Sequence, residues 1–157
     1  MNEDIWRRRQ KLERLFERAG KIDDMEMQAQ MARYLCILTS GFMEASVRAL
    51  FSQYTRAAAN AKVTGYVEQQ LKYFQSASMG NICALTRSFS DEWSAQLEAE
   101  TEGELKDAVN SIVANRHLLS HGGDAGIGLV QMREYYTSAI KVIDLLRRWC
   151  DPEPRSA

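Results

Sequence analysis

The chain has 157 residues and a mass of 17.9 kDa, which suits one domain because a chain of about 150 residues buries roughly 68–70% of its unfolded surface. Hydrophobic residues make up 45% and charged residues 26% of the sequence, shares typical of soluble globular domains that argue against disordered or fibrous chains. The net charge of −1 and pI of about 6.1 exclude the strongly basic class of nucleic-acid-binding proteins, so contact with nucleic acid depends on a local patch.

Membrane and export signals are not predicted. The longest run without a charged residue spans 73–86, which is shorter than the roughly 20 apolar residues of a transmembrane helix. The first 20 residues lack the apolar core of a secretory signal and contain four acidic residues, which argue against a transit peptide. Cys36, Cys83 and Cys150 are too scattered for a metal or redox motif. We therefore expect a cytoplasmic protein with buried thiols and no membrane partner.

Apolar residues recur with a period near 3.6 along nearly the whole chain, which predicts an all-α protein. The first helix is expected to start after Asn2 as N-cap and to end at Gly20, in the C′ position. A second helix is expected from a capping arrangement at Asp23 to about Ala58. Its central Gly41 predicts a close helix contact or a slight bend.

The middle of the chain has weaker signals. A third helix is predicted over about 63–75, and a fourth helical region over about 78–99 with a break near 88–90. A fifth helix is predicted to begin at Thr101, because its hydroxyl and Glu104 match the T-x-x-E capping box.

The C-terminal part has clearer boundaries. The fifth helix is expected to stop at Gly122–Gly123, and the last to run from Leu129 to Cys150, since Pro152 forbids continuation. Short connections favour an up-and-down bundle of about five to six helices. We expect a single domain over 1–151 and a frayed tail over 152–157.

The residues that suggest chemistry lie at the end of the fifth helix. His117 and His121, the two histidines of the chain, fall within the stretch 115–122 together with Arg116. Histidine exchanges protons near neutral pH, and the arginine guanidinium suits a phosphate, so the group favours phosphoryl chemistry. Arg116 follows Ile112 by four residues and should point into the bundle, where it needs a partner or a solvent-filled cleft.

Arg116 and His121 do not share a face of an ideal helix. They are separated by about 140° around its axis and about 7.5 Å along it. Gly122 and Gly123 are expected to end the helix and let His121 turn away from the helical direction. Two copies related by a twofold axis would bring a second arginine and a second histidine to one site.

The stretch Arg116-His117-x-x-x-His121, on the penultimate long helix of a short all-α chain, resembles the R-x4-H motif of the HEPN superfamily of ribonucleases. The long second helix, with SGFMEASVR at 40–48, and the glycine at 122 are similar to the stand-alone prokaryotic RiboL-PSP-HEPN branch.

The resemblance implies an HEPN-like bundle that acts as a homodimeric, metal-independent and cofactor-free endoribonuclease on RNA. By this resemblance His121 is the general acid or base, and Arg116 stabilises the anionic phosphorane. The supporting residues are His117 at the second motif position, Ser120, and Glu44 as an acid from an earlier helix. The product would carry a 2′,3′-cyclic phosphate or its hydrolysed form.

The family also suggests a biological setting. Short members commonly act as toxins or antiphage effectors, often with an antitoxin protein as partner. Other members are inactive, so the alternative is a non-catalytic helical module that binds RNA, a nucleotide or a protein through the same fold.

Several patterns have a second interpretation. His117 and His121 share a helix face and could bind zinc or iron with Asp124 as third ligand. Glu44 and Arg48 form an i, i+4 pair that is as typical of a solvated surface as of a site.

The sequence also has two basic runs, at 7–9 and 147–148. They could form the local patch that RNA needs, although such runs are more often solvated faces. The glycine-rich segment 122–128 lacks the spacing of a phosphate-binding loop and is interpreted as a connector.

Overall fold

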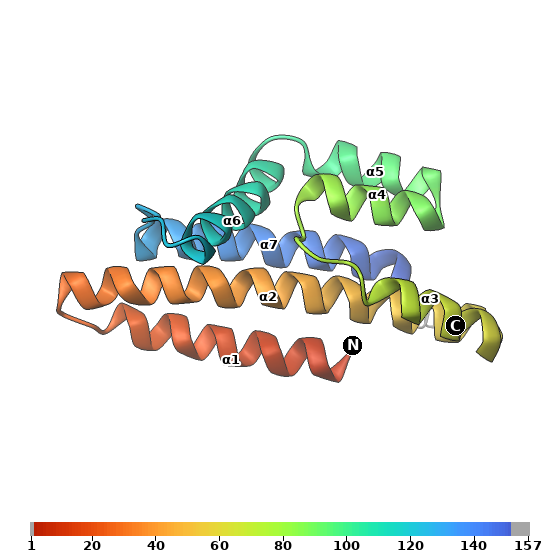
Figure 1. Ribbon diagram of the computed structural model, residues 1–157, viewed down its shortest axis with the longest axis horizontal. Helices are drawn as coiled ribbons and strands as arrows, with labels where there is room; N and C mark the ends of the chain where they lie inside the picture. Colours follow the sequence, from red (N-terminus) through yellow and green to blue (C-terminus); the bar gives the residue numbers. More distant parts are fainter. Residues whose placement is uncertain (1, 152–157) are drawn as a thin grey trace, which may run out of the picture.

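The computed structural model describes residues 2–151 (Figure 1), so the predicted tail over 152–157 lies outside the described residues. Within the described residues the chain forms helices and no strand, which confirms the all-α class. Residues 2–151 contain seven helices, one more than the upper end of the expected range. They are α1 (Glu3–Gly20), α2 (Met25–Ala58), α3 (Ala61–Leu71), α4 (Met79–Phe89), α5 (Asp91–Thr101), α6 (Glu104–Ser120) and α7 (Leu129–Cys150).

The first two helices begin with side-chain caps. Asn2 Oδ1 accepts the N–H groups of Asp4 and Ile5, as predicted. The cap of α2 is Asp24 rather than Asp23, since Asp24 Oδ1 accepts the Met27 N–H at 2.7 Å. The predicted ends of both helices are close to the observed ones, although Gly20 is the last residue of α1 rather than the residue beyond it.

The additional helix comes from the predicted break near 88–90. Ser90 is the C-cap of α4 and the N-cap of α5, where its side chain accepts the Trp93 N–H. The expected capping box at Thr101 is wrong. Thr101 ends α5 and donates its hydroxyl to the Leu97 carbonyl at 2.7 Å, and α6 begins beyond Gly103.

The long helix α2 is the centre of the bundle (Figure 1). It contacts α1, α3, α6 and α7, and α4 pairs with α5 beside α6 and α7. The buried apolar side chains form one cluster that draws on every helix, with Phe51, Met43 and Leu35 of α2 among its largest fully buried members. Helix α6 packs against both α2 and α7.

By length and composition alone, α2 is the one described helix that could cross a membrane. In the most apolar 18-residue stretch of α2, 56% is buried inside the protein. In this structure its apolar side chains thus supply the core of the bundle.

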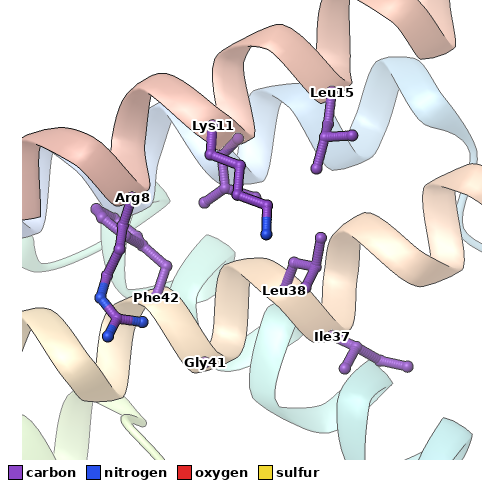
Figure 2. Close-up of a pocket in the computed structure, with 8 residues that line it drawn as sticks. Arg8, Lys11, Leu15, Ile37, Leu38, Gly41 and Phe42 are labelled. Carbon is purple, nitrogen blue, oxygen red and sulfur yellow. The ribbon is translucent and has the colours of Figure 1, made fainter.

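Gly41 lies in a shallow groove between α1 and α2 rather than at a close helix contact (Figure 2). A Cβ atom at this position would meet no atom within 4 Å, so the predicted close contact is wrong. The groove has a volume of about 230 Å³, with Ile37 and Leu38 of α2 below Arg8 and Lys11 of α1.

Candidate active site

The two glycines after α6 end it as predicted. The Gly123 N–H donates to the Leu118 carbonyl at 2.8 Å and the Gly122 N–H to the Leu119 carbonyl at 3.3 Å, which is the Schellman pattern. Gly122 has φ +76°, a backbone conformation that residues other than glycine rarely adopt. A Cβ atom on Gly123 would lie 3.0 Å from the Leu118 carbonyl oxygen. The turn therefore favours glycine at 122 for its backbone conformation and at 123 for the close approach of the Leu118 carbonyl.

His121 does not turn away from the helix, contrary to expectation. It is the C-cap residue, with φ −100° and ψ 16°, and its ring lies 4.4 Å from the His117 ring in a T-shaped contact. The chain changes direction only at Gly122, one residue later, so His121 still follows the helical face of His117. The two imidazoles form one exposed pair at the end of α6.

Arg116 has both the partner and the cleft that its position on α6 predicts. Its Nη1 lies 4.0 Å from Oε1 of Glu44 on α2, and its side chain is 41% exposed in an open groove. The charge of Arg116 also acts on Cys36, whose buried thiol donates a hydrogen bond to the Ile112 carbonyl at 3.5 Å. Burial raises the pKa of Cys36 to about 11, and the Arg116 guanidinium partly opposes this increase.

Glu44 and Arg48 do not form a solvated surface pair. The Glu44 side chain is only 12% exposed, and its separation from Arg48 on the same helix is a long 3.9 Å. Its Oε1 accepts the backbone N–H of Ser76 at 3.0 Å and faces Arg116. One carboxylate thus connects α2, α6 and the segment between α3 and α4.

Ser76 has a left-handed backbone, with φ 55°, which is uncommon for residues other than glycine. In addition to the bond to Glu44, its carbonyl accepts the Ser78 N–H at 2.8 Å and the Asn81 Nδ2 group at 2.8 Å. Such a conformation persists where surrounding contacts over-determine it. Segment 76–81 is therefore a fixed wall beside α6.

This wall and α6 enclose the groove that contains Arg116, which we call the α4–α6 groove. It has a volume of about 610 Å³ and is open to solvent. Its lining residues come from the segment before α4, from the start of α4 and from α6: Ser76, Ser78, Gly80, Asn110, Val113, Ala114, Arg116 and His117.

The structure thus brings Arg116, His117 and Glu44 to one place, while His121 and Ser120 are at its edge. His121 connects to the groove through its ring contact with His117. The Ser120 hydroxyl donates to the Arg116 carbonyl at 2.9 Å. This hydrogen bond lies within the last turn of α6.

Sequence reasoning missed Asn110 and the wall at Ser76. Asn110 could have been found, because it precedes His117 by seven residues and His121 by eleven, the spacing of one helix face. Ser76 could not, because its contacts with Glu44 and Asn81 depend on how distant segments pack.

The alternative metal site lacks its third ligand in this arrangement. Asp124 binds Arg33 of α2, with 2.7 Å between its Oδ1 and Nη2 of the arginine. Within residues 2–151, no three His, Cys, Asp or Glu side chains are grouped as metal ligands. Segment 122–128 is a connector, as expected, and is anchored by buried Ala125 and Ile127.

The two basic runs lie away from the groove. Arg8 pairs with Asp4 at 2.8 Å and Arg148 with Glu100 at 2.6 Å. In Figure 1 the start of α1 and the end of α7 lie toward one end of the bundle, and the end of α6 lies toward the other. The two runs therefore do not form one positively charged surface with Arg116.

Comparison with known proteins adds one finding. A family model described as RiboL-PSP-HEPN matches residues 3–151, which is nearly the entire chain. Among curated proteins and among solved structures, none gives a significant match.

Proposed function

Because the chain belongs to the RiboL-PSP-HEPN family, whose HEPN domains are often ribonucleases, we propose that it is a metal-independent endoribonuclease. The observation that carries this proposal is the environment of Arg116. The arginine of the motif lies in an open groove, beside a largely buried carboxylate, with an imidazole next to it. A guanidinium in such a place can bind a phosphate that enters from solvent.

The proposed reaction uses proton transfer and charge stabilisation. His121 accepts the proton of the attacking 2′-hydroxyl or donates one to the leaving 5′-oxygen. Arg116 binds the non-bridging oxygens of the scissile phosphate and stabilises the charge that develops on the phosphorane. His117 orients the His121 ring through their contact at 4.4 Å. The product is a 2′,3′-cyclic phosphate or its hydrolysed form.

A homodimer completes the proposed site. Arg116 contacts Glu44, whereas His121 contacts His117, so the two proposed catalytic groups of one chain have different neighbours. A second copy related by a twofold axis supplies another arginine and another histidine. α2 has exposed apolar side chains at Met27, Tyr34 and Ile37, the type of surface that subunit interfaces cover.

The test is an RNA cleavage assay in EDTA with the parent protein, Arg116→Ala and His121→Ala. We expect each substitution to reduce cleavage at least a hundredfold, because general acid–base and oxyanion groups each contribute about that much. Arg56→Ala is the matched control, since Arg56 is an exposed arginine of α2 that pairs with Glu68. The proposal is wrong if the parent cuts no RNA, or if both site variants cut as well as Arg56→Ala does.

The second candidate is a non-catalytic module of the same fold that binds RNA or a nucleotide through Arg116. It is favoured by the different neighbours of the two motif residues within one chain, since Arg116 faces Glu44 and His121 contacts His117. The same proteins separate the two candidates, because a binding module binds RNA in an Arg116-dependent manner without cutting it.

We also propose that the protein acts in the cytoplasm as a toxin or antiphage effector that an antitoxin protein neutralises. Expression should then arrest growth, and His121→Ala should remove the arrest without changing the amount of protein. Growth that is equally slow with His121→Ala would contradict this role.

A further inference from the structure

The α4–α6 groove extends beyond the residues that the proposed reaction uses. Asn110, Ala114, His117 and His121 follow one another at intervals of four, three and four residues, so they form one stripe along α6. Asn110 lies two turns, about 10.5 Å, before His117 along the helix axis. A phosphate at Arg116 would therefore leave the Asn110 end of the groove free for another part of the RNA.

The amide of Asn110 is held in one orientation. Its Oδ1 accepts the Met79 backbone N–H at 3.0 Å, and because a backbone N–H can bond only to the oxygen, the oxygen and nitrogen positions are defined. Among the hydrogen bonds of residues 2–151, none uses Nδ2 of Asn110 as donor. Asn110 is exposed and lines the groove, so two N–H donors are available to a ligand there.

The surroundings of Asn110 suit a flat ligand. Val113 and Ala114 provide apolar surface between Asn110 and the motif residues. The opposite wall, segment 76–81, is joined to α2 by the bond from the Ser76 N–H to Glu44 and to α6 by the bond from the Met79 N–H to Asn110. Two bonds to the Ser76 carbonyl stabilise the segment internally. A groove with some apolar surface and one oriented polar group is typical of sites that bind an unstacked base of single-stranded RNA.

We propose that the α4–α6 groove binds the base of a nucleotide next to the scissile phosphate, and that Asn110 Nδ2 donates to the keto oxygen at C4 of a pyrimidine or C6 of a purine. This inference rests on the proposed ribonuclease function. Asparagine usually recognises adenine with its oxygen and nitrogen together, but here the oxygen already accepts the Met79 N–H. The group without a partner among the described residues is Nδ2, and its two N–H donors match O4 of uracil or O6 of guanine rather than the amino groups of cytosine or adenine.

The decisive variant is Asn110→Asp. Aspartate keeps an oxygen for the Met79 N–H but replaces the donor group with a second acceptor, which prefers an amino group. Asn110→Ala removes both functions and serves as a second variant. Asn60→Asp is the matched control, because Asn60 Oδ1 also accepts a backbone N–H, that of Val63 at 3.0 Å, at the start of α3 outside the groove. Thermal unfolding verifies that each variant is folded.

The experiment measures binding and cleavage separately. Fluorescence anisotropy follows 2′-O-methyl hexamers of uridine or inosine, which have a keto oxygen at C4 or C6 and are called the keto hexamers, and of cytidine or adenosine, which have an amino group at that position. These oligonucleotides lack the attacking hydroxyl, so the result does not depend on cleavage. We expect the parent and Asn60→Asp to bind the keto hexamers about tenfold more tightly, Asn110→Ala to lose this preference, and Asn110→Asp to lose or reverse it.

Sequencing of cleavage products should show the same change in the base next to the cut. The inference is overturned if the parent binds the four hexamers equally, or if Asn110→Asp keeps the keto preference. Absence of cleavage by the parent would instead count against the ribonuclease function. The base preference of Asn110 is tested separately, by the binding measurement.

Discussion

Glu44 accepts the Ser76 N–H at 3.0 Å and lies 4.0 Å from Arg116, so two parts of the groove depend on one carboxylate. The sequence predicts Glu44 as a supporting acid and offers Arg48 as its partner on the same helix. The contacts that matter come from residues 32 positions later, at Ser76, and from α6. They could not be predicted, because local spacing carries no information on which distant segment packs against a helix.

Two substitutions separate the roles of this carboxylate. Glu44→Ala should lower the free energy of unfolding by about 1–3 kcal/mol, because the partly buried Ser76 N–H loses its acceptor. Glu44→Gln keeps an acceptor oxygen and should change stability by less than about 1 kcal/mol, while cleavage falls because Arg116 loses its opposing charge. Urea unfolding and the cleavage assay measure both effects. Equal destabilisation by the two variants would show that the charge, rather than the acceptor, holds Ser76.

The buried thiols predict how stability depends on pH. Burial raises the pKa of Cys36 from 9.0 to about 11 and that of Cys150 to about 12. As the pH rises above about 9, the unfolded chain therefore loses these protons before the folded protein does, and unfolding becomes more favourable. Between pH 8 and pH 10 the free energy of unfolding should fall by about 1 kcal/mol per thiol. Urea unfolding at both pH values should show a smaller decrease for Cys36→Ala, and an equal decrease would contradict this assignment.

At the scale of elements, helix signals close to their own residues were predicted well. The cap at Asn2, the ends of α2 and α7, and the glycine stop of α6 lie at or within a residue or two of the expected positions. The prediction fails at Thr101, because its hydroxyl bonds backward to Leu97 and the capping sequence is not used. It also fails at His121, since the chain changes direction at Gly122 rather than at His121.

Gly122 is the residue of this turn that should tolerate substitution least. Gly122→Ala places a Cβ at φ +76° and should cost about 1–2 kcal/mol, with Gly122→Asn costing less. Because the same turn carries His117 and His121, cleavage should fall as well. Gly126→Ala is the control, since a Cβ there meets no atom within 4 Å. Circular dichroism during urea unfolding measures the difference, and indistinguishable Gly122→Ala and Gly126→Ala proteins would contradict the prediction.

At the scale of the whole molecule, the all-α bundle and the family follow from periodicity and from the motif. The composite site needs a test of its own, which mixing of two inactive variants provides. If Arg116 of one chain acts with His121 of its partner, a dimer of Arg116→Ala with His121→Ala contains one complete site. Random mixing makes about half of the dimers mixed, so about a quarter of the parent activity should return. The two unmixed variants are the controls, and a mixture that stays inactive would place both groups in the same chain.

The order of the helices along the chain has a consequence for biosynthesis. α2 is finished about 70 residues before α7 begins, and α6 and α7 are among the helices that cover it. During translation this face of the long apolar helix is therefore exposed until α6 and α7 have left the ribosome, a situation that favours association with chaperones. The groove also needs α6 and therefore cannot form before residue 120 has been synthesised. A nascent chain that ends before α6 thus lacks the proposed ribonuclease site.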